Sequence, residues 1–205
     1  MGDTRQKLID GALGTVRSHG IAGVSARTVA AAAGVNQALV FYHFGSMDDL
    51  LTEACQVATT ASVARYREAF AAVTSLRELL DVGRAVHEQE RADGNVAVLA
   101  QLLAGAQTDG KLAAATGRAL SIWVAEVEGV LRRLLENSAL ADVADPAGLA
   151  HAVSAAFVGL ELFEGVDPAG AAAALTALER LGAVVEAVDD LGPVARRAVR
   201  ARLRR

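Results

Sequence analysis

Residues 25–44, with the sequence SARTVAAAAGVNQALVFYHF, contain side chains whose types and spacing could recognise a nucleic acid. Arg27 carries a guanidinium, Gln37 an amide and Tyr42 a hydroxyl, and each of these groups can bind a base edge or a phosphate. An amide such as that of Gln37 can pair with adenine through two hydrogen bonds. The segment is therefore a candidate nucleic-acid interface, and the alternative is an ordinary helical hairpin within a core.

The elements that must position these side chains are two short helices, at about residues 25–33 and 37–44, with a glycine between them. A helix-turn-helix needs a small residue where its helices cross, which Ala30 supplies. It also needs a turn residue that tolerates a positive φ, here Gly34, and an apolar residue on the inner face of the second helix, here Val40. The spacing of these three residues predicts a helix-turn-helix.

The N-terminal 50 residues resemble the tetracycline-repressor (TetR/AcrR) family of bacterial transcription regulators. The resemblance is carried by an amphipathic helix at residues 4–18, VSARTVA at 24–30, AGV at 33–35, FYHF at 41–44, GS at 45–46 and LL at 50–51. It implies an all-α fold, with an N-terminal three-helix DNA-binding domain at residues 1–46. A larger helical domain for effector binding and dimerisation would occupy residues 47–205.

The resemblance also implies that the second helix of the pair enters the major groove, with its N-terminal end toward the bases. The residues at matching positions are candidates for contacts with bases or phosphates: Ser25, Arg27, Asn36, Gln37, Ala38, Leu39, Tyr42 and His43. Four of them have an alternative role. Gln37 could be an ordinary solvated residue on the surface. Asn36 could cap the helix, Leu39 could pack against the first helix instead of a thymine methyl group, and His43 could belong to the base of the domain.

Two positions depart from the family's pattern. Phe41 stands where the family often has a phosphate-binding Tyr, and Met47 stands where it commonly has Lys. The recognition segment therefore has few cations to bind the DNA backbone. We expect DNA binding to depend instead on a dimer and on four basic residues: Arg5, Lys7, Arg17 and Arg27.

The composition favours helices throughout the chain. Hydrophobic residues make up 53% of the 205 residues, aromatic residues only 4%, and there are 3 Pro. Abundant alanine favours closely packed helices and argues against a β-sandwich. The single cysteine, Cys55, excludes an internal disulfide and a multi-cysteine zinc site, and we expect no metal and no cofactor. Because no signal peptide or membrane span is apparent, we expect a cytoplasmic protein without a membrane partner.

The net charge of −4 is unevenly distributed along the chain. Residues 1–47 carry a net charge of +2, residues 48–192 carry −12, and residues 193–205 contain six Arg and no acidic residue. This acidic body argues against a general polyanion binder but permits a nucleic-acid-binding module at one end. The Arg-rich end is either a solvated tail or a contact for DNA or an acidic patch.

The rest of the chain is predicted as helices at about residues 47–73, 75–92, 95–107, 110–137, 146–164, 168–189 and 193–204. In Asp145-Pro146 and Asp167-Pro168 the proline suits the first helical position. The resemblance implies dimerisation through about residues 146–189, whose two long helices would form a four-helix bundle with a second copy. The alternative is that these helices form an intramolecular core.

The resemblance places an effector pocket among the middle helices. The aromatic and polar residues that could line it are Tyr66, Phe70, His87, Gln101, Gln107, Trp123, Glu126, Phe157, Glu161 and Phe163. Trp123 and Glu126 lie one helical turn apart, so they could share a pocket wall. Ordinary core or surface is the alternative for each of them.

These observations predict a ligand-responsive dimeric transcription regulator, namely a repressor that a small molecule releases from a palindromic operator. One alternative is an architectural DNA-binding protein without a ligand. Another is a helical enzyme that uses His87 and Glu90. Since the chain has no HExxH motif, nucleophile elbow or phosphate-binding glycine loop, we expect it not to be an enzyme.

Overall fold

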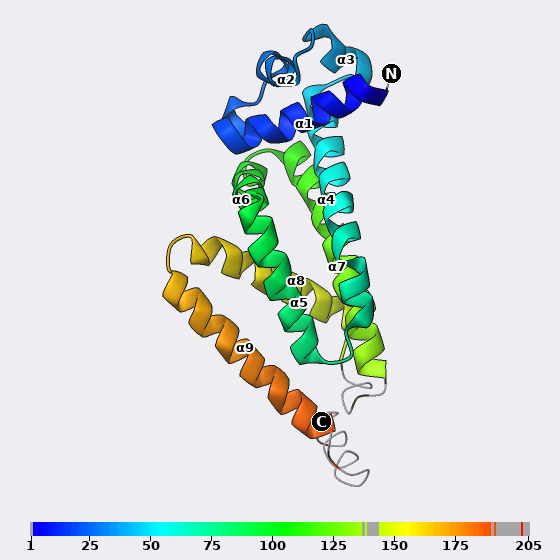
Figure 1. Ribbon diagram of the computed structural model, residues 1–205, viewed down its shortest axis with the longest axis vertical. Coiled ribbons are helices and arrows are strands. Elements are labelled where there is room, and N and C mark those ends of the chain that lie inside the picture. Colours follow the sequence, from blue (N-terminus) through cyan, green and yellow to red (C-terminus); the bar gives the residue numbers. More distant parts are fainter. Residues whose placement is uncertain (1, 137, 139–143, 190, 192–201, 203–205) are drawn as a thin grey trace. The chain divides into compact units, whose positions relative to one another are not determined.

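The computed structural model describes residues 2–136, 138, 144–189, 191 and 202, and every regular element within them is helical (Figure 1). The elements are α1 (Gly2–His19), the 3-10 helix η1 (Ile21–Gly23), α2 (Ala26–Ala33), α3 (Ala38–Phe44), α4 (Met47–Ala72), α5 (Leu76–Ala92), α6 (Asn95–Ala106), α7 (Gly110–Glu136), α8 (Pro146–Glu164) and α9 (Pro168–Asp189). The all-α prediction is confirmed. The helix predicted at residues 193–204 lies outside the described residues, except for residue 202. The predictions for the Arg-rich end concern the same residues and stay predictions.

The helix boundaries follow the residues that predicted them. Gly34 ends α2 with φ +66° and Gly45 ends α3 with φ +78°, a region of backbone conformation in which a side chain would be strained. At the start of α8, the Asp145 carboxylate accepts hydrogen bonds from the backbone N–H groups of Ala147 (3.1 Å) and Gly148 (3.0 Å). Local chemistry therefore decides where these helices begin and end.

The chain divides into two compact units, which we describe separately. The first contains residues 1–64 and 89–122, and the second contains residues 65–88 and 123–205. The helices α4, α5 and α7 each contribute one part to the first unit and one part to the second.

In the first unit, α1, α2 and α3 pack around the N-terminal part of α4 (Figure 1). The three residues that predicted the helix-turn-helix core behave as expected, because Val40 and Ala30 are buried and Gly34 has a positive φ. The crossing of α1 over α2 also depends on Gly11, where an added Cβ would lie 2.9 Å from the carbonyl oxygen of Val29. Only glycine permits this close approach.

In the second unit, the core joins the C-terminal part of α4 with α5, α7 and α8. Its buried residues are Phe70, Val73, Leu79, Val86, Val130, Leu131, Leu135 and Ala150. The helix α9 lies against α5, because Glu179 pairs with Arg84 and a Cβ at Gly182 would contact Leu80 at 3.7 Å. Large apolar side chains on α8, on α9 and between them nevertheless remain exposed: Leu149, Leu162, Phe163, Val166, Leu181 and Val184.

Among the described helices, α8 is the one that is long and apolar enough to cross a membrane by length and composition alone, with a mean hydropathy of 1.4 over its 18-residue window. Glu161 on this helix is 8% exposed and lies 3.3 Å from His87 of α5 within the same unit. One side of α8 therefore packs inside the protein through a polar contact. Leu149, Leu162 and Phe163 of the same helix are exposed.

Candidate nucleic-acid interface

The first helix of the pair, α2, begins at a capping box. The Ser25 hydroxyl accepts a hydrogen bond from the backbone N–H of Thr28 (3.2 Å), and the Thr28 hydroxyl accepts one from the backbone N–H of Ser25 (2.9 Å). Arg27, in the first turn of α2, is exposed and has no hydrogen-bond or ion-pair partner among the described residues. Its guanidinium can therefore bind a group outside the chain.

The turn between α2 and α3 satisfies its own backbone groups. The positive φ of Gly34 lets the N–H of Val35 donate to the carbonyl of Ala30 at 3.0 Å, which closes the end of α2. The Asn36 side chain then accepts a hydrogen bond from the N–H of Ala38 at 2.9 Å. Asn36 thus caps the start of α3, whereas a base contact by Asn36 stays a prediction.

The second helix, α3, buries one side and exposes the other. Val40 is fully buried and Phe44 is 9% exposed, and both belong to the core that α1, α2 and α4 complete. The exposed residues at and beyond the start of this helix are Gln37, Ala38, Phe41 and Tyr42, and Tyr42 is 72% exposed. The amide and the phenol predicted to contact DNA are therefore both free of the core.

Two of the predicted DNA-binding residues lie at the border of this exposed face. Leu39 is half-buried against the core, so the packing alternative is observed and only part of its side chain remains for a thymine methyl group. His43 is also half-buried, with its ring edge-on to that of Tyr42 at 5.0 Å between centres. A phosphate contact by His43 stays a prediction.

Three of the four basic side chains predicted to support DNA binding have partners inside the first unit. The pairs are Arg5 with Glu53, Lys7 with Asp3 at 2.7 Å, and Arg17 with Asn95 at 3.1 Å. Exposed pairs such as those of Lys7 and Arg17 contribute little and can be exchanged for a phosphate. Arg5 differs from the other three basic residues, because its guanidinium contacts both the Glu53 carboxylate and the backbone carbonyl of His43.

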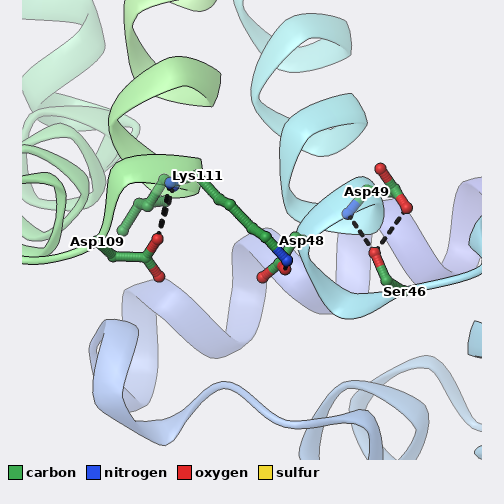
Figure 2. A network of polar contacts seen from close by, with 6 residues as sticks. Ser46, Asp48, Asp49, Asp109 and Lys111 are labelled. Atoms are coloured by element: carbon green, nitrogen blue, oxygen red, sulfur yellow. Dashed lines mark hydrogen bonds and ion pairs between the residues drawn. The ribbon is translucent and has the colours of Figure 1, made fainter.

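The start of α4, directly after α3, is held by polar contacts (Figure 2). The Ser46 hydroxyl accepts a hydrogen bond from the N–H of Asp49 (3.1 Å) and donates one to its carboxylate (2.6 Å), so Ser46 caps the start of α4. The Nζ of Lys111 donates to Asp48 at 2.8 Å, while the N–H of Lys111 donates to Asp109 at 2.9 Å. The hydrogen bond that Lys111 donates to Asp48, together with the attraction between the two charges, raises the pKa of Lys111. The same pair ties the first turn of α4 to that of α7.

A cavity of about 200 Å³ lies beside this ion pair in the first unit. Its lining comes from η1, α4, the loop before α7 and α7, and consists of Ile21, Val24, Met47, Asp48, Leu51, Asp109, Lys111, Leu112 and Ala115. None of the predicted effector residues is in this lining.

The family comparison concerns the helices described above. The family model for bacterial regulatory proteins of the tetR family matches residues 8–54, which run from α1 to the start of α4. This domain belongs to the TetR family. The resemblance recognised in the N-terminal sequence is confirmed.

Solved structures of other regulators share the fold over most of the chain. A protein described as a TetR-family transcriptional regulator from Rhodococcus sp. is 23% identical, with a TM-score of 0.74 over 90% of this chain and 99% of that one. The fatty acid degradation regulator FadR from Bacillus halodurans is 18% identical, with a TM-score of 0.69 over 86% and 96%. A transcriptional regulator from Saccharomonospora viridis in complex with choline is 18% identical, with a TM-score of 0.65 over 88% and 93%.

No curated protein matches the chain. Because the solved structures are less than 25% identical to it, their likeness is one of fold. The predicted architecture, a TetR-family helix-turn-helix domain followed by a larger helical domain, is confirmed.

Part of the predicted effector set forms an aromatic cluster in the second unit. Tyr66 and Phe70 of α4 face Trp123 of α7, with ring centres 6.1 and 6.3 Å apart. On the next turn of α7, Glu126 lies 3.6 Å from Arg67. This surface ion pair gives the cluster a polar edge.

A second group lies between α5 and α8 of the same unit. The Nδ1 of His87 is 3.3 Å from Glu161, its Nε2 is hydrogen-bonded to Glu164, and its ring is edge-on to Phe157 at 6.0 Å. Gln101 does not join either group, since it is exposed on α6 in the first unit, where a Cβ at Gly20 would lie 3.2 Å from its side-chain oxygen.

His87 and Glu90, considered as a catalytic alternative, make their described contacts with different residues. Glu90 accepts hydrogen bonds from Ser62 and Asn95 in the first unit, while His87 contacts the carboxylates of α8. These separate contacts give no support to the enzyme alternative.

Two residues that position the TetR-family interface are missed by reasoning from the sequence. Gly11 interrupts the amphipathic pattern of α1, and this interruption is a signal for close helix approach. Glu53 carries no such signal, because its partner Arg5 is 48 residues away in the sequence.

Proposed function

We propose that this chain is a homodimeric repressor that remains on a palindromic operator until a small molecule releases it. In this proposal residues 1–46 read DNA, and residues 47–205 bind the effector and dimerise. The observation that carries it is the exposed face of α2 and α3, where Arg27, Gln37 and Tyr42 are accessible while the opposite faces of both helices are buried.

The base contacts of this proposal come from the N-terminal end of α3 and from α2. Gln37 pairs with adenine in the major groove, where the short side chain of Ala38 allows close approach to the bases. Arg27 reaches a base or a phosphate from α2. The Ser25 hydroxyl and the N-terminal amides of α2 bind a phosphate.

Three further residues flank these base contacts. The Tyr42 hydroxyl binds a phosphate and so replaces the hydroxyl that Phe41 lacks. His43 supplies a second phosphate contact beside it, and the Asn36 amide group offers its N–H₂ to a base while its oxygen caps α3. Leu39 contributes the part of its side chain that the core leaves exposed.

The proposed dimer forms through α8 and α9. Monomeric proteins rarely expose many large apolar side chains on neighbouring helices, yet Leu181 and Val184 of α9 are 63% and 61% exposed, and Phe163 of α8 is 50% exposed. Packing the two helices of one copy against those of a second copy would bury these side chains in a four-helix bundle. A two-fold dimer then presents two copies of α3 to two half-sites.

The proposed effector site lies in the second unit, beside the Trp123 cluster and the His87–Glu161 contact. An apolar wall with a few buried polar groups is the usual composition of a small-molecule site, and Glu161 is 8% exposed. The regulator from Saccharomonospora viridis is in complex with choline, so a protein of this fold can bind a small organic ligand. We leave Gln101 out of the site because it belongs to the first unit.

Release follows from a shift between two conformations of the dimer. The effector favours a conformation in which the two recognition helices no longer match the operator spacing, and DNA favours the other. The two ligands therefore weaken each other's binding by the same factor. Since the operator lies on the chromosome of a bacterial cell, we place the protein in the cytoplasm.

The test of DNA recognition starts with selection of genomic DNA fragments by the purified protein. We expect the selected fragments to share a palindrome with half-sites about one helical turn apart. Selection without a common sequence would contradict operator binding and would favour the architectural alternative.

The assigned contacts are then tested by substitution. We expect Gln37→Ala and Arg27→Ala each to weaken operator binding by about 1–3 kcal/mol per lost base contact, measured by fluorescence anisotropy. Gln89→Ala and Arg118→Ala are matched controls, because both residues are exposed on helices outside the DNA-binding domain, and they should bind as the native protein does. Unchanged affinity in the first pair would contradict the assignment.

The effector is tested with a collection of small organic molecules added to the protein–operator complex. A true effector releases the labelled operator and raises the melting temperature of the free protein. Trp123 is the single tryptophan of the chain, so its fluorescence reports binding in the second unit. If compounds release DNA while Trp123→Phe and Glu161→Gln keep full sensitivity, the effector site lies elsewhere.

A further inference from the structure

Arg5 of α1 makes contacts on every side of its guanidinium, and all of them lie within the first unit. Its Nε donates to Oε1 of Glu53 at 2.8 Å, and its Nη2 donates to the other oxygen of the same carboxylate. Its Nη1 donates to the backbone carbonyl of His43 at 2.8 Å. Its central carbon lies 4.4 Å from the centre of the Phe44 ring.

The carbonyl of His43 is one of the groups that a helix cannot satisfy by itself. The last four carbonyls of any helix lack an intrahelical partner, and α3 has only seven residues. A cation is also favoured at a helix C-terminus, where the helix dipole is negative. Arg5 therefore caps the recognition helix from another element of the fold.

The orientation of so short a helix depends on its tertiary contacts, because a helix of seven residues is not stable by itself. Arg5 holds the backbone of α3 at His43 and its side-chain core at Phe44. Glu53 on α4 holds Arg5 in turn through two parallel hydrogen bonds, a geometry that a lysine could not reproduce. The pair thus connects α1, α3 and α4 at the C-terminal end of the recognition helix.

The Arg5–Glu53 pair is better suited to orienting α3 than to stabilising the folded protein. The side chains of Arg5 and Glu53 are 40% and 31% exposed, and partly exposed ion pairs contribute little to folding. The same contacts use three of the five N–H donors of Arg5 and hold its guanidinium in place, so it is less available to a phosphate than an unpaired arginine would be. This differs from the prediction that Arg5 belongs to the cations that bind the DNA backbone.

We propose that Arg5 and Glu53 are positioning residues, which set the orientation of α3 on the operator and so act on sequence discrimination without contacting DNA. This inference rests on the proposed function, because it takes α3 as the recognition helix. A phosphate-binding Arg5 would behave differently in two respects. It would strengthen binding to every DNA sequence alike, and Glu53 would oppose binding as a nearby negative charge.

The experiment compares the full-length native protein with Glu53→Gln, Arg5→Lys and Arg5→Gln. Fluorescence anisotropy measures their Kd for the selected operator and for a scrambled duplex of equal length, each at several salt concentrations. Lys7→Gln is the matched control, since it removes one positive charge from the same helix and, among the described residues, Lys7 pairs locally with Asp3. Thermal unfolding by circular dichroism accompanies every variant.

We expect Glu53→Gln and Arg5→Lys to weaken operator binding by about tenfold, as when one base contact is misaligned. Their affinity for the scrambled duplex and the slope of log Kd against log salt should stay as in the native protein, because no phosphate contact is lost. Arg5→Gln should show the same selective loss. Lys7→Gln should affect both duplexes equally and leave their ratio unchanged.

Two results would overturn the proposal. In the first, Glu53→Gln binds the operator as well as the native protein or more tightly, while Arg5→Gln loses equal affinity for both duplexes and its salt slope falls by about one. In the second, Glu53→Gln and Arg5→Lys lose operator binding only because their melting temperatures fall below the assay temperature, which makes the pair a stabilising contact. A native protein that prefers no sequence would instead overturn the proposed function.

Discussion

At the scale of single residues, Gly34 decides the turn of the helix-turn-helix. A residue with a side chain would be strained at the φ of +66° that Gly34 adopts, although an added Cβ there would meet no atom within 4 Å. The requirement at this position is therefore one of backbone conformation and not of space.

We predict that Gly34→Ala lowers the free energy of unfolding by about 1 kcal/mol. Gly14→Ala is the matched control, because an added Cβ at Gly14 also meets no atom within 4 Å and its backbone is helical. Gly14→Ala should instead raise the free energy of unfolding by about 0.5–1 kcal/mol. Chemical denaturation measures both variants, and equal effects of the two substitutions would contradict the argument.

Cys55 makes the free energy of unfolding depend on pH. Burial raises the pKa of its thiol from 9.0 to about 11, because the apolar surroundings disfavour the thiolate. A raised pKa means that the folded state binds the proton more tightly than the unfolded state. The resulting stability is complete below pH 9 and is lost as the pH rises toward 11.

We therefore predict that the native protein loses more stability between pH 8 and pH 10.5 than Cys55→Ala does. Other groups titrate in both proteins, so the difference between the two isolates the thiol. Denaturant unfolding at the two pH values measures it. An identical pH dependence in both proteins would show that the buried thiol does not contribute.

At the scale of elements, the start of a helix depends on its cap. The start of α8 is an example, because Asp145 accepts two backbone hydrogen bonds and Pro146 occupies the first turn. We predict that Asp145→Ala lowers the free energy of unfolding by about 1 kcal/mol. Asp81→Ala, in the interior of α5 and exposed, should be neutral or slightly stabilising. Denaturant unfolding at a fixed protein concentration compares them, and an equal loss in both would exclude a capping effect.

The caps also explain why the elements could be predicted. Asp, Ser, Pro and Gly act on the backbone within three or four residues of their own position, so the boundaries of α2, α3, α8 and α9 follow from the sequence alone. The contact between α1 and α2 at Gly11 does not, because it joins two elements.

At the scale of the whole molecule, the exposed apolar face of α8 and α9 decides assembly. We predict that Leu181→Glu shifts the protein from dimer to monomer at micromolar concentration, because a buried carboxylate in the bundle would lack a partner. Size-exclusion chromatography with light scattering measures the mass.

Val57→Glu is the control for this substitution, since Val57 is 37% exposed on α4 in the first unit. It should remain a dimer. A native protein that is monomeric at this concentration, or a dimeric Leu181→Glu variant, would contradict the proposed interface. Loss of the dimer should also weaken operator binding, because a single domain contacts only one half-site.

The sequence by itself determined the all-α fold, the helix boundaries and the helix-turn-helix with its exposed Arg27 and Gln37. These features depend on periodicity, caps and glycines, whose effects are local. Tertiary structure alone decided which side chains meet. Arg5 reaches Glu53 across 48 residues and His87 reaches Glu161 across 74, because folding brings distant helices together and so selects partners that no local pattern specifies.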